Sequence, residues 1–336
     1  MSQPDFDFLT PDNVLHAVES AFSVRLDGTL QAYSSYVNRV YGIRTDDGDE
    51  YVVKFYRPGR WTDDALAEEH EFVLDCADAE LPVVAPIADS EGDTLQTLEV
   101  ESESGVAHAA FALYAKRGGR GFDAESDDDW LRLGTLLGRL HLVASRHRAE
   151  HRLTCTPLGS TVQFVNELLD SGAVYGDLLD EFRTVVEEAI ALITPLFDSI
   201  PTQRIHGDFH RGNVLEREGE GLLIIDFDDM MMGPPVQDLW LLLPDHAFAA
   251  MRELNLLLEG YEQFVCFDRA TLALIEPLRL MRMIYYLAWS AYQLSDHKFL
   301  AANPDWGSRA FWIREVEDLR TQASVIVAEM RDRANG

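Results

Sequence analysis

Residues 204–215 read RIHGDFHRGNVL, and residues 225–229 read IDFDD. Apolar residues stand on both sides of the polar segment EREGEG in VLEREGEGLLIIDF, residues 214–227, a pattern that predicts a short β-hairpin. Because a tight hairpin returns both of its ends to the same edge, we expect Asp208, Asn213 and Asp226 to converge. In phosphoryl transfer one Asp accepts the proton of the attacking hydroxyl, while an Asn and another Asp hold Mg²⁺ against the nucleotide phosphates. The two stretches therefore predict a phosphotransfer site, with Asp208 as the general base and Asn213 and Asp226 as metal ligands.

Two other interpretations of the first stretch are open. His206, Asp208 and His210 form an H-x-D-x-H cluster, and both residue types are zinc ligands. A zinc site leaves the spacing of Asn213 and the hairpin before IDFDD unexplained, and a purely structural turn with buried histidines accounts only for HGD. Four residues separate Asp208 from Asn213, the separation found in kinase catalytic loops, so phosphotransfer explains more of the pattern.

The first third of the chain is rich in strand patterns. Residues 30–45 and 50–56 flank the polar turn DDGD and predict a hairpin, and residues 94–102 and 106–115 predict a second pair of strands. Between the two pairs, Thr62 is a suitable N-cap for a helix that has an acidic first turn and apolar residues at helical spacing. These patterns predict a β-rich unit that contains one helix.

From about residue 127 onward the pattern is helical. Residues 127–145 carry apolar side chains at i, i+3, i+4 and i+7, and residues 160–198 and 246–335 also read as helices. We therefore predict an α+β fold with a small β-rich N-terminal lobe, residues 1–116, and a larger helical C-terminal lobe, residues 117–336, that carries the catalytic and substrate-binding groups.

Lysine is scarce in this chain. Of the 28 basic residues three are lysines, Lys54, Lys116 and Lys298, which leaves 28 − 3 = 25 arginines. A lysine that is kept where arginine is used almost everywhere is a candidate for a task that needs a compact point charge. Lys54 lies in the strand pattern YVVKF, as does the lysine that kinases direct at the ATP phosphates. We therefore expect Lys54 to contact nucleotide phosphates.

The helix partner of Lys54 is expected within the segment LAEEHEF. Glu69 is favoured because Phe72 and Val73 follow it at i+3 and i+4 and would face the core beside it. Glu68 is the alternative, and a solvated acidic helix face would give neither residue a partner.

The stretches HGDFHRGNVL and IDFDD resemble the H-G-D-x-H-x-x-N motif and the later metal-binding segment of the protein-kinase-like phosphotransferases. That superfamily includes aminoglycoside phosphotransferases, choline kinases and homoserine kinases. Further segments, spread over nearly the whole chain, are similar to the bacterial stress response kinase A family: SYVNRVY at 35–41, YVVKFYRPGRWT at 51–62, EEHEF at 68–72, LPVVAPIA at 81–88, GPPVQDLWLLL at 233–243 and EPLRLMRMIYYLAW at 276–289.

The resemblance implies a bilobal protein-kinase-like fold, with ATP bound by the N-terminal lobe and Mg²⁺ as a further cofactor. It implies serine/threonine protein kinase activity tied to survival under stress, and hence protein substrates with a Ser or Thr acceptor. It places Ser35 at the ATP site, where other kinases carry the G-x-G-x-x-G loop that this chain lacks, together with Lys54 and Glu69. His210 stands where the Ser/Thr protein kinases usually carry a lysine, so a role for it in phosphoryl transfer stays open.

Two other functions share parts of this pattern. A small-molecule kinase acting on homoserine, choline or an aminoglycoside-like hydroxyl would use every one of these catalytic residues, and it is the alternative to a protein kinase. A non-catalytic kinase-like module would have lost one or more of Lys54, Asp208, Asn213 and Asp226, and all four are present. We also expect Asp238, in GPPVQDLW, to hold the catalytic loop by hydrogen bonds.

Charge and composition exclude other classes of protein. The formal net charge of −30 disfavours binding to nucleic acids and anionic membranes. The longest apolar stretch contains Arg279 and Arg282, so it predicts a buried helix and not a membrane span. The first residues lack the pattern of a signal peptide, and the three separated cysteines fit reduced thiols, so we expect a cytoplasmic protein. We also expect a monomer, although no sequence feature determines the oligomeric state. The acidic, lysine-poor composition fits either a saline cytoplasm or a base-composition bias of the genome.

Overall fold

The computed structural model describes residues 6–102, 105–295 and 297–335. The chain forms two compact units, each assembled from separate stretches. Unit 1 comprises Met1–Asp123, Ala149–Arg152 and His210–Met230, and unit 2 comprises Ala124–Arg148, Leu153–Phe209 and Met231–Gly336. The catalytic-loop motif therefore passes from unit 2 into unit 1 between Phe209 and His210.

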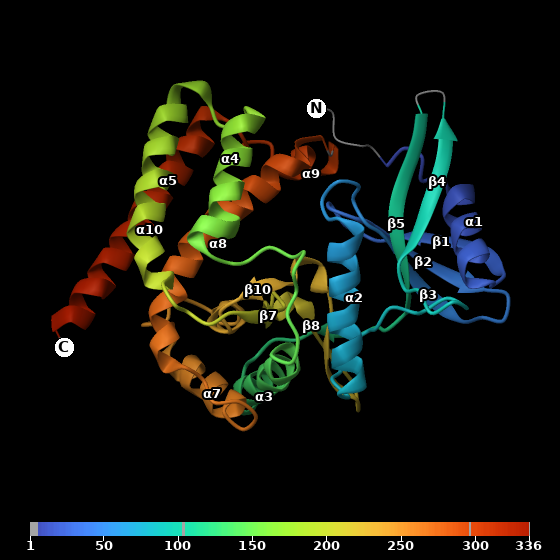
Figure 1. Ribbon diagram of the computed structural model, residues 1–336, viewed down its shortest axis with the longest axis horizontal. Helices are drawn as coiled ribbons and strands as arrows, with labels where there is room; N and C mark the ends of the chain where they lie inside the picture. The colour runs from blue at the N-terminus through green and yellow to red at the C-terminus, as the bar shows by residue number, and fades with distance from the viewer. Residues whose placement is uncertain (1–5, 103–104, 296, 336) are drawn as a thin grey trace. The chain divides into compact units, whose positions relative to one another are not determined.

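Unit 1 is built on a five-stranded antiparallel sheet in the order β1-β2-β3-β5-β4 (Figure 1). Its strands are β1 (Leu26–Ala32), β2 (Arg39–Thr45), β3 (Glu50–Phe55), β4 (Gln96–Ser102) and β5 (Gly105–Ala115). Both predicted hairpins, β2–β3 and β4–β5, are present. The central strand β3 carries Lys54, which lies opposite Val40 on one side and Ala112 on the other. Neighbouring strands on both sides therefore fix the backbone of Lys54.

The apolar core of unit 1 lies between this sheet and helix α1 (Pro11–Phe22) (Figure 1). Val14 and Val18 of α1 are fully buried, as are Phe55 and Phe111 of the sheet, whose rings stack with centroids 5.0 Å apart. Each such buried side chain contributes about 1.5–3 kcal/mol to stability, so this layer anchors the sheet that carries Lys54.

Two further elements complete unit 1. Helix α2 (Asp63–Asp78) begins at the predicted N-cap, where the Thr62 hydroxyl accepts the backbone N–H of Ala65. The predicted hairpin forms as β8 (Val214–Arg217) and β9 (Gly221–Ile224), and the short strand β6 (Arg120–Gly121) pairs with β8.

Unit 2 is mainly helical. Its helices are α3 (Asp127–Ala144), α4 (Val162–Ser171), α5 (Leu179–Ile193), α6 (Val236–Trp240), α7 (Met251–Tyr261), α8 (Ile275–Tyr292), α9 (His297–Ala302) and α10 (Arg309–Asn335). Helices α4, α5, α8 and α10 pack side by side (Figure 1). Two short strands, β7 (Gln203–Ile205) and β10 (Met231–Gly233), pair antiparallel beside them.

Helices α3 and α7 approach each other unusually closely. A Cβ atom on Gly134 of α3 would collide with the backbone of Leu257, and one on Gly260 of α7 would collide with the backbone of Leu131. Only glycine allows two helix backbones to come this near. The close approach matters because one residue from each helix supports the catalytic loop, as described below.

The expected α+β architecture, with strands in the first third of the chain and helices after it, is confirmed. Among the described residues, no helix is both long enough and apolar enough to cross a lipid bilayer. The division into lobes at residues 116 and 117 stays a prediction.

Candidate active site

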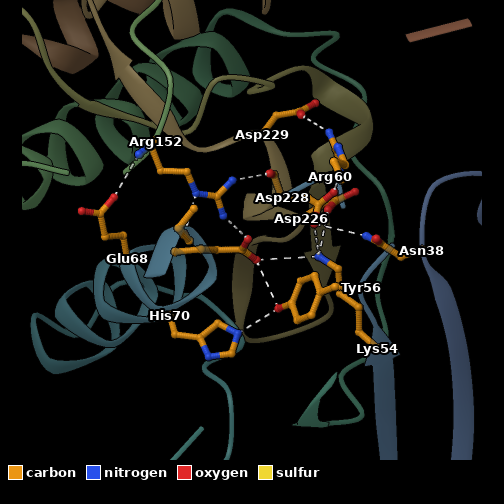
Figure 2. Close-up of polar contacts among 12 residues, drawn as sticks. Asn38, Lys54, Tyr56, Arg60, Glu68, His70, Arg152, Asp226, Asp228 and Asp229 are labelled. Carbon is orange, nitrogen blue, oxygen red and sulfur yellow. Dashed lines mark hydrogen bonds and ion pairs between the residues drawn. The ribbon is translucent and has the colours of Figure 1, made fainter. Parts of the chain in front are cut away.

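Lys54 lies at the centre of a cluster of charged side chains in unit 1 (Figure 2). Its Nζ is 2.9 Å from Asp228 Oδ1, 3.7 Å from Glu69 Oε1 and 3.8 Å from Asp226 Oδ1. The side chain is 13% exposed, and its ammonium lies 4.9 Å from the centre of the Tyr56 ring. Burial by itself would lower the pKa of Lys54, but the three carboxylates raise that pKa above its usual value. Lys54 is therefore charged at neutral pH.

Glu69 reaches this cluster from the buried face of α2. As predicted, Phe72 and Val73 are buried beside it, and the Glu69 side chain is only 3% exposed. Besides Lys54, Glu69 has a closer cation: its Oε2 is 2.5 Å from Nη2 of Arg152. Glu68, the alternative partner, instead accepts backbone N–H groups of residues 150–152. Glu69 is thus the α2 carboxylate that faces Lys54.

The segment after β9 supplies two carboxylates with different surroundings. Asp226 is 56% exposed on its side chain and has a φ of 63°, a left-handed conformation that Asp and Asn adopt more readily than most residues. Asp228 is buried and contacts Lys54, the Arg60 guanidinium and the Asn38 side-chain amide (Figure 2). Burial would raise the pKa of Asp228, but Lys54 and Arg60 hold that pKa below its usual value. Asp228 is therefore ionised, as a partner of Lys54.

Asn213 lies at the other end of the β8–β9 hairpin. It closes a short 3₁₀ turn, Arg211–Asn213, and it is buried. Its backbone carbonyl accepts the N–H of Ile225, the residue before Asp226. The hairpin therefore brings Asn213 and the Asp226 segment to the same edge of unit 1, as the sequence predicted for these two residues.

The segment around Ser35 is held by arginine side chains. The Arg57 guanidinium donates to the carbonyls of Tyr36 and Val37, and Arg39 donates to the carbonyl of Ser35. Arg57 also donates its backbone N–H to the side chain of Asn38. Asn38 in turn donates to Asp228, which links this segment to the partners of Lys54.

In unit 2 the loop after β7 carries Asp208. The Asp208 Oδ1 is 2.5 Å from Nη2 of Arg282, which comes from α8. The ring of His206 accepts the backbone N–H of Asp208 at 3.3 Å, so this histidine supports the loop. In unit 1, His210 likewise accepts the N–H of Gly212 with its Nδ1.

The side-chain carboxylate of Asp238, in α6, holds the backbone of the same loop, as predicted. It accepts the N–H groups of His206 at 2.7 Å and Gly207 at 2.9 Å. A third contact reaches Nε2 of His141 in α3, whose Nδ1 lies 3.0 Å from the Tyr261 hydroxyl in α7. Asp238 and His141 are fully buried, so three helices fix the backbone just before Asp208.

Sequence reasoning missed several of these residues. Asp228 could not be distinguished from a surface acid, nothing in the local sequence pointed to Arg152 or His141, and Arg282 was not assigned a role. One available signal was that Arg282 falls within an otherwise apolar helical stretch. A charge in that position needs a partner, and here the partner is Asp208.

The residues present suit Mg²⁺ better than zinc. Asn213 and Asp226 offer amide and carboxylate oxygens, the ligand type that Mg²⁺ prefers, and Mg²⁺ is usually bound by one or two carboxylates together with substrate phosphates. A structural zinc site needs about four protein ligands. In the part of the chain that the structure describes, no three His, Cys, Asp or Glu side chains are grouped to hold a metal ion.

The fold is that of a phosphotransferase. The model of the phosphotransferase enzyme family matches residues 29–275, and the chain belongs to that family. Within it the chain belongs to the stress response kinase A family: it is 36% identical over 324 residues to Stress response kinase A of Escherichia coli (strain K12), with 96% of this chain and 94% of that protein covered. The resemblance seen in the sequence is thereby confirmed.

Two further comparisons concern a relative in sequence and a relative in fold. It is 33% identical over 328 residues to the serine/threonine protein kinase RdoA of Salmonella typhimurium (strain LT2), covering 96% of this chain and 94% of that protein. The solved structure of the amicoumacin kinase hAmiN, in complex with AMP-PNP, Ca²⁺ and Ami, is similar in fold, with a TM-score of 0.73 over 93% of both chains. At 18% identity this second likeness concerns the fold alone.

Proposed function

We propose that this chain is an ATP- and Mg²⁺-dependent serine/threonine protein kinase that protects the cell under stress. The observation that carries the proposal is the cluster around Lys54. One cation is held between an α2 carboxylate, Glu69, and the carboxylates Asp226 and Asp228 that follow a β-hairpin. Kinases use this combination to align nucleotide phosphates.

In the proposed mechanism, unit 1 binds the nucleotide. Lys54, aligned by Glu69, pairs with phosphate oxygens, and Ser35 contributes its hydroxyl and backbone N–H. Asn213 and Asp226 would hold Mg²⁺, which when bound neutralises charge on the phosphates. The half-exposed carboxylate of Asp226 suits this role, since a metal ligand must remain accessible to the nucleotide.

Asp208 is proposed to accept the proton of the acceptor hydroxyl as that hydroxyl attacks the γ-phosphorus. Its contact with Arg282 fixes the orientation of the carboxylate. The hydrogen bonds from the loop backbone to Asp238 support this geometry. Such fixed placement is a main source of rate enhancement in phosphoryl transfer.

The name of one relative, the serine/threonine protein kinase RdoA, supports a protein acceptor. The alternative, a small-molecule alcohol, is supported by the fold of hAmiN, whose name describes it as an amicoumacin kinase. The two functions share the same catalytic residues, so only the phosphorylated product distinguishes them.

The test is a phosphotransfer assay with γ-labelled ATP, Mg²⁺ and purified protein, using a generic protein acceptor, a cell lysate and a panel of small alcohols. We expect label on Ser and Thr after phosphoamino acid analysis, and little on the alcohols. Asp208→Ala should lower the rate about 100- to 10,000-fold, the usual contribution of a general base. Label found mainly on an alcohol would favour the small-molecule alternative.

The metal assignment is tested with Asp226→Asn, because asparagine tolerates the left-handed backbone that alanine would strain. Its activity should fall sharply, and its half-saturating Mg²⁺ concentration should rise. Glu218→Gln is the matched control, since Glu218 is exposed in the turn of the same hairpin and should behave like the wild type. Full activity of Asp226→Asn at low Mg²⁺ would contradict the assignment.

A further inference from the structure

A four-residue segment from the middle of the chain is built into unit 1. Residues Ala149–Arg152 belong to unit 1, whereas the residues before and after them belong to unit 2. The segment has neither helical nor strand structure. We call it the clip segment, because two adjacent acids of α2 hold it in different ways.

Glu68 holds the backbone of the clip segment. Its carboxylate accepts the N–H groups of Glu150 at 2.5 Å and His151 at 2.9 Å. It also accepts the N–H group of Arg152 at 3.1 Å (Figure 2). Three donors on one carboxylate fix the course of a short irregular segment. The backbone at Arg152 therefore has a defined position relative to α2.

The Arg152 side chain is fully buried and makes three hydrogen bonds (Figure 2). Its Nη2 is 2.5 Å from Glu69 Oε2, its Nε donates to the Ala65 carbonyl at 2.8 Å, and its Nη1 donates to the Asp228 carbonyl at 2.9 Å. Its guanidinium also lies 4.2 Å from the centre of the Trp61 ring. A planar fork can satisfy this set of acceptors at once, whereas a lysine ammonium cannot.

The Glu69 carboxylate consequently has two neighbouring cations, which lie at different distances from it. Arg152 is at 2.5 Å, within hydrogen-bond range, while Lys54 is at 3.7 Å, and Lys54 is closer to Asp228. A buried carboxylate needs a paired cation. Arg152 supplies one to Glu69 whether or not Lys54 is near.

We infer that Arg152 is a positioning residue that keeps Glu69 neutralised, so that Glu69 does not compete with the nucleotide phosphates for Lys54. The inference rests on the proposed function, because it concerns the same nucleotide site. Without Arg152, the buried Glu69 would draw Lys54 towards itself and compete with the phosphates for it. The clip segment thus determines how strongly Lys54 pairs with the nucleotide phosphates.

The test measures binding and not only activity. The dissociation constant of the Mg²⁺ complex of AMP-PNP is determined by calorimetry for the wild type, Arg152→Met, Arg152→Lys, Glu69→Gln and the double variant Glu69→Gln/Arg152→Met. Arg152→Met should bind about tenfold more weakly, which is the size of one charge-assisted contact. Arg152→Lys should recover most of the affinity, because it restores the charge, although it loses the contacts to the two carbonyls.

The double variant decides whether Arg152 acts through Glu69. If it does, Glu69→Gln/Arg152→Met binds as tightly as Glu69→Gln alone, because no buried carboxylate remains to compete for Lys54. The comparison of Glu69→Gln with the double variant also tests the inference if Arg152→Met by itself does not fold. Arg44→Lys, at a half-exposed arginine of β2, is the matched control and should bind like the wild type.

Wild-type affinity in folded Arg152→Met would overturn the inference, as would a double variant that binds about tenfold more weakly than Glu69→Gln. A wild-type protein that does not bind AMP-PNP at all would instead contradict the proposed function. In kinetic assays the same defect should appear in the KM for ATP and leave the KM for the acceptor unchanged.

Discussion

The neutral state of His70 should make the protein sensitive to mild acid. His70 is buried in α2 next to Glu69, and its ring nitrogens contact the hydroxyls of Tyr56 and Thr94, each at 2.8 Å. Burial, reinforced by the charges of Lys54 and Arg152, lowers the pKa of His70 to about 3 from its usual 6.5. Between pH 6.5 and about 3, His70 is therefore protonated in the unfolded chain and neutral in the folded chain.

The sign and the size follow from proton linkage. Because the folded pKa is depressed, this contribution to stability is fully present above pH 6.5 and is lost as the pH falls towards 3. Each pH unit below the unfolded pKa costs about 1.4 kcal/mol. Between pH 7.5 and pH 5.0 the contribution of His70 to the free energy of unfolding should fall by about 2 kcal/mol.

Urea unfolding at the two pH values measures this effect in the wild type and in His70→Gln. Glutamine cannot be protonated but keeps a donor and an acceptor, so the variant should lose about 2 kcal/mol less than the wild type over the same interval. His16→Gln, on the exposed face of α1, is the control and should retain the wild-type pH dependence. An equal loss in His70→Gln and the wild type would refute the reasoning.

Three other predictions concern unit 2 and the net charge. Gly134→Ala should destabilise the protein by about 3 kcal/mol, seen as a lower Tm, because its methyl group meets the backbone of Leu257; an unchanged Tm would contradict the close helix contact. Asp238→Asn should lower kcat about 100-fold and leave nucleotide affinity unchanged, since His206 and Gly207 donate to different oxygens of Asp238 and one of these becomes an NH2 donor; a kcat equal to wild type would show that the loop does not depend on it. Raising NaCl from 0.1 to 1 M should raise the Tm, because the Debye length shortens from about 10 Å to about 3 Å and the repulsion within the net charge of −30 is screened more strongly. A Tm that falls would argue against a saline cytoplasm.

The local elements could be predicted because their signals are local. The β2–β3 hairpin follows from alternation around a polar turn, and α2 follows from the Thr62 cap and apolar residues at helical spacing. The position of Glu69 opposite Lys54 follows from the same spacing, since Phe72 had to face the core. In each case, residues within a few positions of each other carry the information.

The remaining parts of the candidate site depend on contacts between distant segments. Arg152 lies 83 positions from Glu69, in a segment without any periodic pattern, and Arg282 lies 74 positions from Asp208. Asp228 is one acid in the run DFDD, and only the fold determines that it is buried against Lys54 while Asp226 is half-exposed. Burial and pairing of this kind are properties of the assembled units.

The discontinuity of unit 1 also constrains how the chain can fold during synthesis. The sheet that bears Lys54 is complete at residue 115, but Arg152 and the segment His210–Met230 are still to be translated. The 230 − 123 = 107 residues from Asp123 to Met230 take about 5–20 s at usual elongation rates. Lys54 and Glu69 are present without Arg152 at the start of that interval, and without Asp226 and Asp228 until its end. Unit 1 of a nascent chain is therefore unfinished until residue 230 has been translated, and Ala124–Arg148 and Leu153–Phe209 of unit 2 are made in the meantime.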